Sequence, residues 1–180
     1  MSDQNDEKRT YSRVDTHLRL FIRRLPSLDT QPAFLDCAGC ESSEQADDLK
    51  KGNLPEALVD FLMQLNNKLD MLLSAQSRSM LREDFPVEGV VTEISGAGLR
   101  FTCQQCDDFT PGEALEVVVQ LSTIPFRLAG AVGKIVRRER KDDQPGWVLE
   151  FSTMRESDLE AVIHFVFKEQ RARIRQQKFS

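Results

Sequence analysis

The chain has 180 residues, of which 40% are hydrophobic and 29% are charged, and its formal net charge is −5. This composition is ordinary for a soluble globular protein, and it argues against a membrane protein and against a wholly disordered chain. The negative net charge also argues against non-specific binding of nucleic acid polymers. Nevertheless, 16 of the 24 basic residues are arginine, the side chain suited to bidentate contacts with phosphate.

No segment of the sequence has the character of a membrane span or a signal peptide. The apolar stretches fall short of the ~20 residues that cross a bilayer. The first ten residues, MSDQNDEKRT, are polar and charged where a signal peptide is apolar. We therefore expect a cytoplasmic protein with no membrane insertion, in which the four cysteines are free thiols.

Residues 1–25 are predicted to form an N-terminal arm followed by a first strand. The run THLRLFIRRL at 16–25 mixes apolar and basic residues over the length of a strand, and Pro26 ends it. Residues 26–54 then lack periodicity and are polar, acidic and rich in turn formers. Because so long a structureless loop is unusual inside a compact domain, they are predicted to be a linker into an inserted element.

The insertion, residues 26–85, contains a predicted long helix at about 55–83. Pro55 suits a first helical turn, and neither Gly nor Pro interrupts the helix before Pro86. Leucines recur along it with alternating spacings of four and three residues, which is the a/d seam of a coiled coil over about two and a half heptads. These are Leu58, Leu62, Leu65, Leu69 and Leu72.

This leucine seam has two interpretations. The helix either packs on its own domain or pairs with the same helix of another subunit. A single small domain rarely offers a groove long enough to bury such a helix, so pairing is favoured. We therefore expect a homo-oligomer formed through helix 55–83.

After Pro86 the sequence consists of short β-rich runs separated by turn signals. The predicted strands are 87–94, 99–103, 114–121, 126–138 and 147–151. Together with 16–25 they make six short strands, which is typical of a small antiparallel barrel. A final helix is predicted from Ser157, whose Ser-Asp-Leu-Glu is a capping box. The predicted fold class is all-β dominated (β+α): a six-stranded antiparallel β-barrel completed by residues 86–180, with a C-terminal helix and an inserted amphipathic helix.

The sequence contains no motif typical of an enzyme. His17 and His164 fall inside a predicted strand and a predicted helix, with neither a nucleophile elbow nor a His-Glu-x-x-His motif nearby. No P-loop or dinucleotide-binding fingerprint is present. We therefore expect a protein that is not an enzyme and has no cofactor.

The cysteines form two Cys-x-x-Cys pairs, Cys37 with Cys40 and Cys103 with Cys106. Four thiolates could complete a tetrahedral zinc site. However, the long insertion separates the two pairs by far more than the usual ribbon spacing, and neither pair is followed by the glycine that shapes a zinc knuckle. Incidental free cysteines are the favoured interpretation, with zinc and redox chemistry as weaker alternatives.

Two arginines precede the first predicted strand as an R-x-x-x-R pair, Arg9 and Arg13, outside any predicted regular element. Such pairs also arise by chance, and two others lie on predicted helices, where they form an ordinary solvated face. The first pair gains meaning from its combination with the turn Glu93-Ile-Ser-Gly-Ala-Gly98. A mobile arm beside this turn could hold a ligand that is both anionic and purine-like, because guanidinium pairs with phosphate and reads guanine O6 and N7.

Each residue of the turn offers a specific group. Gly98 can take a positive φ, Ser95 offers a hydroxyl, and the carboxylate of Glu93 can accept from guanine N1–H and N2–H. The alternative is that the arginines are a solvated tail, Glu93 an edge charge, and Ser95 and Gly98 merely a hairpin turn.

These two motifs resemble the signature of the PilZ domain, a bacterial six-stranded β-barrel that serves as a receptor for cyclic di-GMP. The family has R-x-x-x-R before the first strand and (D/N)-x-S-x-x-G at the second. Residues 8–15, KRTYSRVD, match the arm, and residues 93–101, EISGAGLRF, match the turn, with Glu93 where the family has Asp or Asn. The resemblance covers about residues 8–25 and 86–175. The inserted helix is similar to that of a tetrameric PilZ subtype.

The resemblance implies a function. Arg9 and Arg13 would hold the phosphates and guanine of cyclic di-GMP, and Glu93, Ser95 and Gly98 would form the base-side lip. The protein would then relay the level of this second messenger to an unidentified downstream protein through its oligomer or partner surface. The alternative is a degenerate PilZ scaffold that binds no nucleotide and acts as an oligomeric protein-interaction module.

Overall fold

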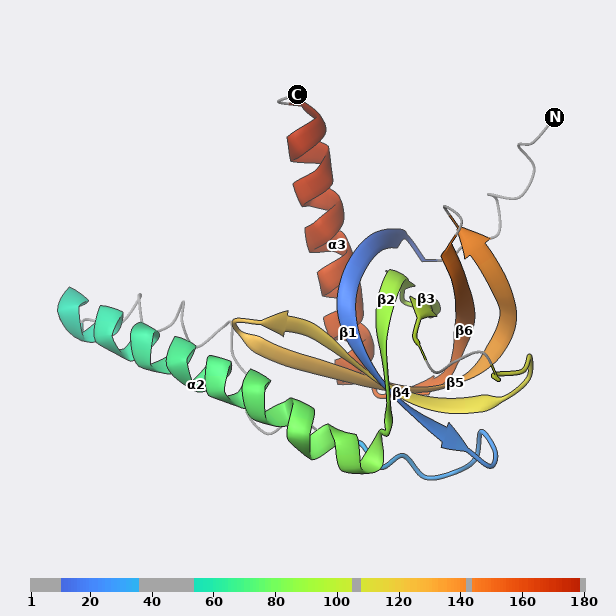
Figure 1. The fold of residues 1–180 in the computed structure, drawn as a ribbon. Helices are drawn as coiled ribbons and strands as arrows, with labels where there is room; N and C mark the ends of the chain where they lie inside the picture. Colours follow the sequence, from blue (N-terminus) through green and yellow to red (C-terminus); the bar gives the residue numbers. More distant parts are fainter. Residues whose placement is uncertain (1–10, 36–53, 105–107, 142–143, 179–180) are drawn as a thin grey trace.

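The computed structural model describes residues 11–35, 54–104, 108–141 and 144–178. Within them lie six strands and two long helices (Figure 1). The elements in chain order are β1 (Arg13–Leu25), α2 (Glu56–Asp84), β2 (Val87–Ser95), β3 (Gly98–Thr102), β4 (Ala114–Thr123), β5 (Phe126–Lys141), β6 (Gln144–Met154) and α3 (Glu156–Lys178). Neither described helix is apolar over enough of its length to cross a membrane.

All six strands pair antiparallel and close into a barrel in the order β1-β2-β3-β6-β5-β4, with β4 pairing back onto β1. The predicted fold class is therefore confirmed. Most strands are longer than predicted, and β5 and β6 form a long hairpin whose pairing extends to Lys141 and Gln144. Local alternation indicates where a strand lies but does not mark its ends, because edge pairing extends into polar residues.

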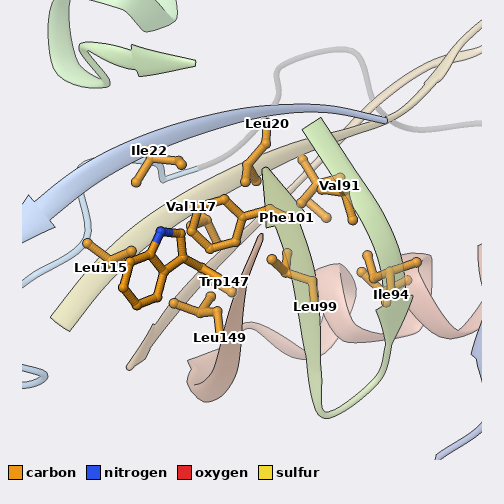
Figure 2. Close-up of a cluster of buried hydrophobic side chains, with 14 of the residues drawn as sticks. Leu20, Ile22, Val91, Ile94, Leu99, Phe101, Leu115, Val117, Trp147 and Leu149 are labelled. Carbon is orange, nitrogen blue, oxygen red and sulfur yellow. The ribbon is translucent and has the colours of Figure 1, made fainter. Parts of the chain in front are cut away.

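The barrel interior is filled by inward-facing side chains from all six strands. Phe101, Trp147 and Leu149 meet residues of β1, β2 and β4 in this core (Figure 2). Phe109 packs edge-on against both Phe101 and Trp147, an arrangement favoured by the ring quadrupoles. The core is a packed interior rather than a pore, so a ligand must bind on the outside of the barrel.

Helix α2 is present almost as predicted, and its two ends have different surroundings. Its C-terminal end leads into Phe85, which is buried with Phe21, Val118, Phe126 and Leu128 of the barrel. The rest of the helix extends past the barrel (Figure 1). Four of the five seam leucines are exposed, from 43% for Leu58 to 65% for Leu72. Within the described residues, the C-terminal end of α2 packs on the barrel, and four of the five seam leucines are exposed.

Helix α3 follows β6 directly and begins one residue earlier than predicted, at Glu156. Ser157 therefore lies in the first turn rather than at the N-cap, and the predicted capping box is wrong. Instead, the guanidinium of Arg155 donates to the carboxylate of Asp158 at 2.8 Å. Val162 and Val166 anchor the helix to the barrel core, and its C-terminal half projects from the barrel (Figure 1).

The chain leaving β1 is held against the barrel by a buried carboxylate. Glu116 of β4 is 1% exposed, and it accepts from the guanidinium of Arg23 and from the backbone N–H groups of Ala33 and Phe34. The ring of Phe34 in turn lies over Gly130, where a Cβ would come within 2.4 Å of it. The start of the insertion is therefore part of the packed structure as far as Phe34.

Cys103, immediately after β3, is disulfide-bonded, and its partner lies outside the described residues. The expectation of free cysteines is therefore wrong for Cys103, because it rested on compartment alone, which does not determine which thiols meet. A sulfur held in a disulfide is not available as a zinc thiolate. Cys37, Cys40 and Cys106 lie outside the described residues, so their part of the zinc hypothesis stays untested. Within the described ranges, no group of three His, Cys, Asp or Glu side chains is placed to hold a metal ion.

Candidate ligand-binding site

One cavity of about 260 Å³ on the outer face of the barrel is lined by four of the five predicted ligand-binding residues. They are Arg13, Glu93, Ser95 and Gly98. Arg9 lies outside the described residues. Arg13 is the first residue of β1, so the expectation that it precedes the first strand is wrong. Strand β1 starts earlier because Arg13 and Asp15 pair with Ser95 and Glu93 of β2.

Strand register places a row of side chains across the floor of this cavity. Glu93 on β2 is the partner of Arg100 on β3, which is the partner of Val148 on β6, which in turn is the partner of Arg137 on β5. All four residues line the cavity. Closure of the barrel therefore brings together residues that are up to 55 positions apart in sequence, counted from Glu93 to Val148.

The turn 95–98 lies at the cavity and is held by its own hydrogen bonds and by packing against β6. The Ser95 hydroxyl donates to the Gly98 carbonyl at 3.2 Å and accepts from the Ala97 N–H at 3.3 Å, which cross-links the turn. Gly98 does not have a positive φ, since Gly112 is the described glycine that does. A Cβ at Gly98 would lie 2.3 Å from the carbonyl oxygen of Leu149. Glycine is required here by the close approach of β6.

Tyr11, within the arm, is a contact that the motif analysis did not single out. A Cβ at Gly96 would lie 2.6 Å from the Tyr11 ring, so the ring lies directly on the turn. Gly96 thus makes room for the aromatic residue between the two motif arginines. The R-x-Y-x-R spacing was the available signal, because it places the aromatic residue two positions from Arg13 on the same face of an extended chain.

Beside the cavity, oppositely charged side chains form a network across four elements. Arg13 pairs with Glu93 at 3.3 Å, and Glu93 also pairs with Lys141 of β5 at 2.9 Å. Lys141 pairs with Asp15 at 2.6 Å, and Asp15 pairs with Arg173 of α3 at 3.2 Å. The strand register brings Asp15 and Glu93 together. The network thus links β1 and β2, the strands on either side of the insertion, to β5 and α3.

The network shifts the titration of its two central groups. The hydrogen bond from Lys141, helped by the one from Arg173, lowers the pKa of Asp15 from its ordinary value of 3.8. The carboxylates of Asp15 and Glu93, in that order, raise the pKa of Lys141 from 10.5. Both shifts favour the charged forms of Asp15 and Lys141.

Arg100 and Arg137 also line the cavity, and sequence reasoning did not identify either of them. Arg137 is half-exposed and pairs with Glu139 at 3.4 Å. Arg100 is buried, at 5% exposure. In sequence Arg100 was visible only as the residue between Leu99 and Phe101, since alternation alone does not distinguish an exposed arginine from a buried one.

A second, larger hollow of about 1,330 Å³ lies between α2 and the barrel, and none of the four predicted ligand-binding residues that the structure describes lines it. His17 and Arg19 of β1 line it together with Ser74 and Arg82 of α2. His17 thus lies in a different hollow from the arginine-lined cavity.

The model of the PilZ domain matches residues 70–168, more than half of the chain. The chain belongs to the PilZ domain family. PilZ domains are in general non-enzymatic binding domains and receptors for cyclic di-GMP. The matched region includes Glu93, Ser95, Gly98 and Arg100 and begins after the arm.

Solved structures agree with this membership at the level of the fold. The motility inhibitor MotI/DgrA of Bacillus subtilis has a TM-score of 0.51 and 15% identity, over 91% of this chain and 51% of that one, so the chain spans about half its length. A tetrameric PilZ domain protein of Xanthomonas campestris, self-assembled through a helical bundle, has a TM-score of 0.50 and 18% identity, over 92% and 91% of the two chains. The comparison with curated proteins gives no match.

Proposed function

We propose that this PilZ protein is a receptor that binds cyclic di-GMP and relays its level through an oligomer or partner surface. The observation that carries the proposal is the shared cavity. Arg13, Glu93, Ser95 and Gly98 were each predicted from sequence motifs, and all four line a single hollow of about 260 Å³. Membership of a family of cyclic di-GMP receptors supports the same ligand.

The chemistry of the cavity suits a guanine nucleotide with phosphates. Arginine pairs bidentately with phosphate and with guanine O6 and N7, and a carboxylate accepts from guanine N1–H and N2–H. The cavity is slightly smaller than the ~300–1,000 Å³ usual for small-molecule sites. The cavity therefore takes one end of the dinucleotide.

Binding requires an exchange of partners. Without ligand, Arg13 and Glu93 neutralise each other at 3.3 Å. A phosphate that pairs with Arg13, and a guanine that donates to Glu93, would replace this contact with two charge-assisted hydrogen bonds. The Tyr11 ring lies on the turn next to this ion pair. An exchange of partners at Arg13 would therefore also move Tyr11, and in this way ligand binding could change the surface of the protein.

Calorimetric titration with cyclic di-GMP tests the proposal. Arg13→Ala is expected to weaken binding about 10- to 100-fold, because hydrogen bonds to charged groups contribute about 1.5–3 kcal/mol. Arg19→Ala is a matched control, since Arg19 is on the same strand and lines the other hollow. Equal affinities of the wild type, Arg13→Ala and Arg19→Ala would refute the assignment of this cavity, and no binding by the wild type would refute the function.

An oligomer formed through α2 is the second part of the proposal. Leu69 is 51% exposed, Leu72 is 65% exposed and Phe61 is 62% exposed on this helix. A repeated apolar seam of this kind favours helix pairing between subunits. The helical bundle that assembles the Xanthomonas campestris PilZ tetramer supports this arrangement. If nucleotide does not bind, the same surface supports the alternative function, an oligomeric protein-interaction module.

Light scattering distinguishes these functions. The double variant Leu69→Asp/Leu72→Asp is expected to dissociate the oligomer, and Gln64→Asp, which places a charge on the helix outside the seam, is expected to leave it intact. An oligomer whose mass, shape and partner binding are indifferent to cyclic di-GMP would favour the interaction module. A monomeric wild type would contradict assembly through α2.

A further inference from the structure

Arg100 on the cavity floor is a buried guanidinium that forms no ion pair with any described residue. Its Nη1 donates to the Thr92 hydroxyl at 2.7 Å and its Nη2 to the Gln144 carbonyl at 2.8 Å. Its Nε is buried and has no acceptor. Of the five N–H groups of a guanidinium, two are therefore satisfied, and both by neutral oxygens.

The carboxylates of the cavity do not neutralise Arg100, because each is engaged by another cation. Glu93, the cross-strand neighbour of Arg100, pairs with Arg13 and Lys141. Glu139 pairs with Arg137, and Glu150 pairs with Lys134. Three carboxylates line the cavity, and all three have their own partners.

An arginine cannot escape this situation by losing its proton, since its pKa is above 12. Burial of an ion without a counter-ion costs several kcal/mol, and proteins retain such groups mainly where function needs them. The backbone around Arg100 accommodates it specifically. A Cβ at Gly146 would lie 3.0 Å from both Cζ and Nη2 of Arg100. The fold thus reserves room for a cation that has no counter-ion among the described residues.

We propose that Arg100 binds a phosphate of the ligand and is the cation that the anionic ligand neutralises on the cavity floor. This inference rests on the proposed function and adds a residue to the site. Arg13, at the rim, already has a carboxylate partner to exchange, whereas Arg100 has none to lose. Phosphate binding at Arg100 therefore gains charge neutralisation without breaking an ion pair.

The test compares stability with affinity in the same variant. Arg100→Met keeps an unbranched apolar side chain and removes the guanidinium and its charge. Removal of a buried, unpaired ion is neutral or stabilising, so the urea midpoint is expected to be unchanged or higher. The affinity for cyclic di-GMP is expected to fall about 10- to 100-fold, the value of a charge-assisted hydrogen bond. A role confined to holding the β5–β6 hairpin predicts the reverse: a lower midpoint and an unchanged affinity.

Two further variants isolate the contact. Arg137→Met removes the same charge from the same cavity, but Arg137 is half-exposed and already paired, so the affinity is expected to fall less than about threefold. Arg100→Lys keeps the charge without the planar fork, and its affinity is expected to lie between the values for wild type and Arg100→Met. If Arg100→Met binds cyclic di-GMP as well as Arg137→Met does, the proposal is wrong.

Pyrophosphate and guanosine, used as separate probes in thermal unfolding, distinguish this proposal from the function on which it rests. Pyrophosphate is expected to raise the melting temperature of the wild type and not that of Arg100→Met. If it does so while cyclic di-GMP does not bind, the anion site stands and the nucleotide function fails. If cyclic di-GMP binds both proteins equally, the function stands and the role of Arg100 fails. If Arg100→Met loses the rise in melting temperature caused by guanosine but keeps the rise caused by pyrophosphate, Arg100 contacts the base and the proposal is overturned.

Discussion

Glu116 and Arg100 are both buried charges, and the fold surrounds them in opposite ways. Glu116 is 1% exposed and accepts four hydrogen bonds, two from Arg23 and two from backbone N–H groups. Arg100 is 5% exposed, donates two hydrogen bonds to neutral oxygens, and has no ion pair within the described ranges. Glu116 has its hydrogen bonds filled and does not line the cavity, whereas Arg100 has an unfilled donor and lines it.

The difference indicates what each charge is for. A saturated carboxylate joins parts of the chain, here β1, β4 and the start of the insertion, and its removal leaves several donors without acceptors. A cation with few hydrogen bonds contributes little to holding the chain together, but it still has donors with which to bind a ligand. Burial alone is therefore a weak guide to function, and the partners of the buried group are the informative observation.

The largest expected effect is at Glu116. Glu116→Ala leaves the Arg23 guanidinium and the N–H groups of Ala33 and Phe34 without their acceptor, and is expected to lower the free energy of unfolding by about 3–5 kcal/mol. Urea denaturation measures this change. Glu150→Ala, which removes a carboxylate that is 57% exposed and 3.7 Å from Lys134, is the control and is expected to cost less than about 1 kcal/mol. Similar losses for the two variants would remove the distinction between the buried and the surface carboxylate.

A smaller effect is expected when Arg100 is displaced rather than removed. Gly146→Ala adds a Cβ 2.9 Å from the Phe101 carbonyl and 3.0 Å from the Arg100 guanidinium. Overpacking of this kind costs about 1–3 kcal/mol, and we expect the affinity for cyclic di-GMP to fall as well. In the double variant Arg100→Ala/Gly146→Ala the two losses of affinity should not add, because both act on one group. Additive losses in titration would show that Gly146 affects the site independently of Arg100.

The smallest effect is expected in the exposed ion-pair network, where Asp15 and Lys141 are 56% and 42% exposed. Lys141 is the main cause of the lowered pKa of Asp15. The ionised carboxylate therefore adds stability above about pH 4 that is lost as the pH falls through the lowered, folded-state pKa. In Lys141→Met this acid-dependent loss is expected to shrink, by less than about 1 kcal/mol. Urea midpoints measured from pH 6 down to pH 2 check this. Parallel curves for the two proteins would show that Lys141 does not stabilise the Asp15 carboxylate.

Much of the fold could be predicted from local signals. Alternating apolar residues and turn signals located all six strands, and Pro55 and the lack of Gly or Pro before Pro86 located α2 to within one residue at each end. The errors were at boundaries and caps. Strand β1 begins at Arg13 because of pairing with β2, and Ser157 falls inside α3. Such details depend on contacts between elements, which local patterns do not report.

The candidate site was predicted only in part. Motif spacing selected Arg13, Glu93, Ser95 and Gly98, and these residues share a cavity. It assigned the wrong reason to Gly98, which is glycine because the β6 backbone comes within contact distance. It also missed Tyr11, Lys141 and Arg100, whose contacts join segments with no motif in common.

The sequence by itself determined the arginine excess, the paired motifs and the long helix, because each depends on composition or on spacing within one segment. Only the tertiary structure decided that Arg100 is buried with no counter-ion among the residues that the structure describes. Closure of the barrel places Gln144 against Arg100 from 44 residues away and assigns every carboxylate of the cavity to another cation. The partner of a charge is set by register between strands, and in this chain register follows from packing of the whole barrel.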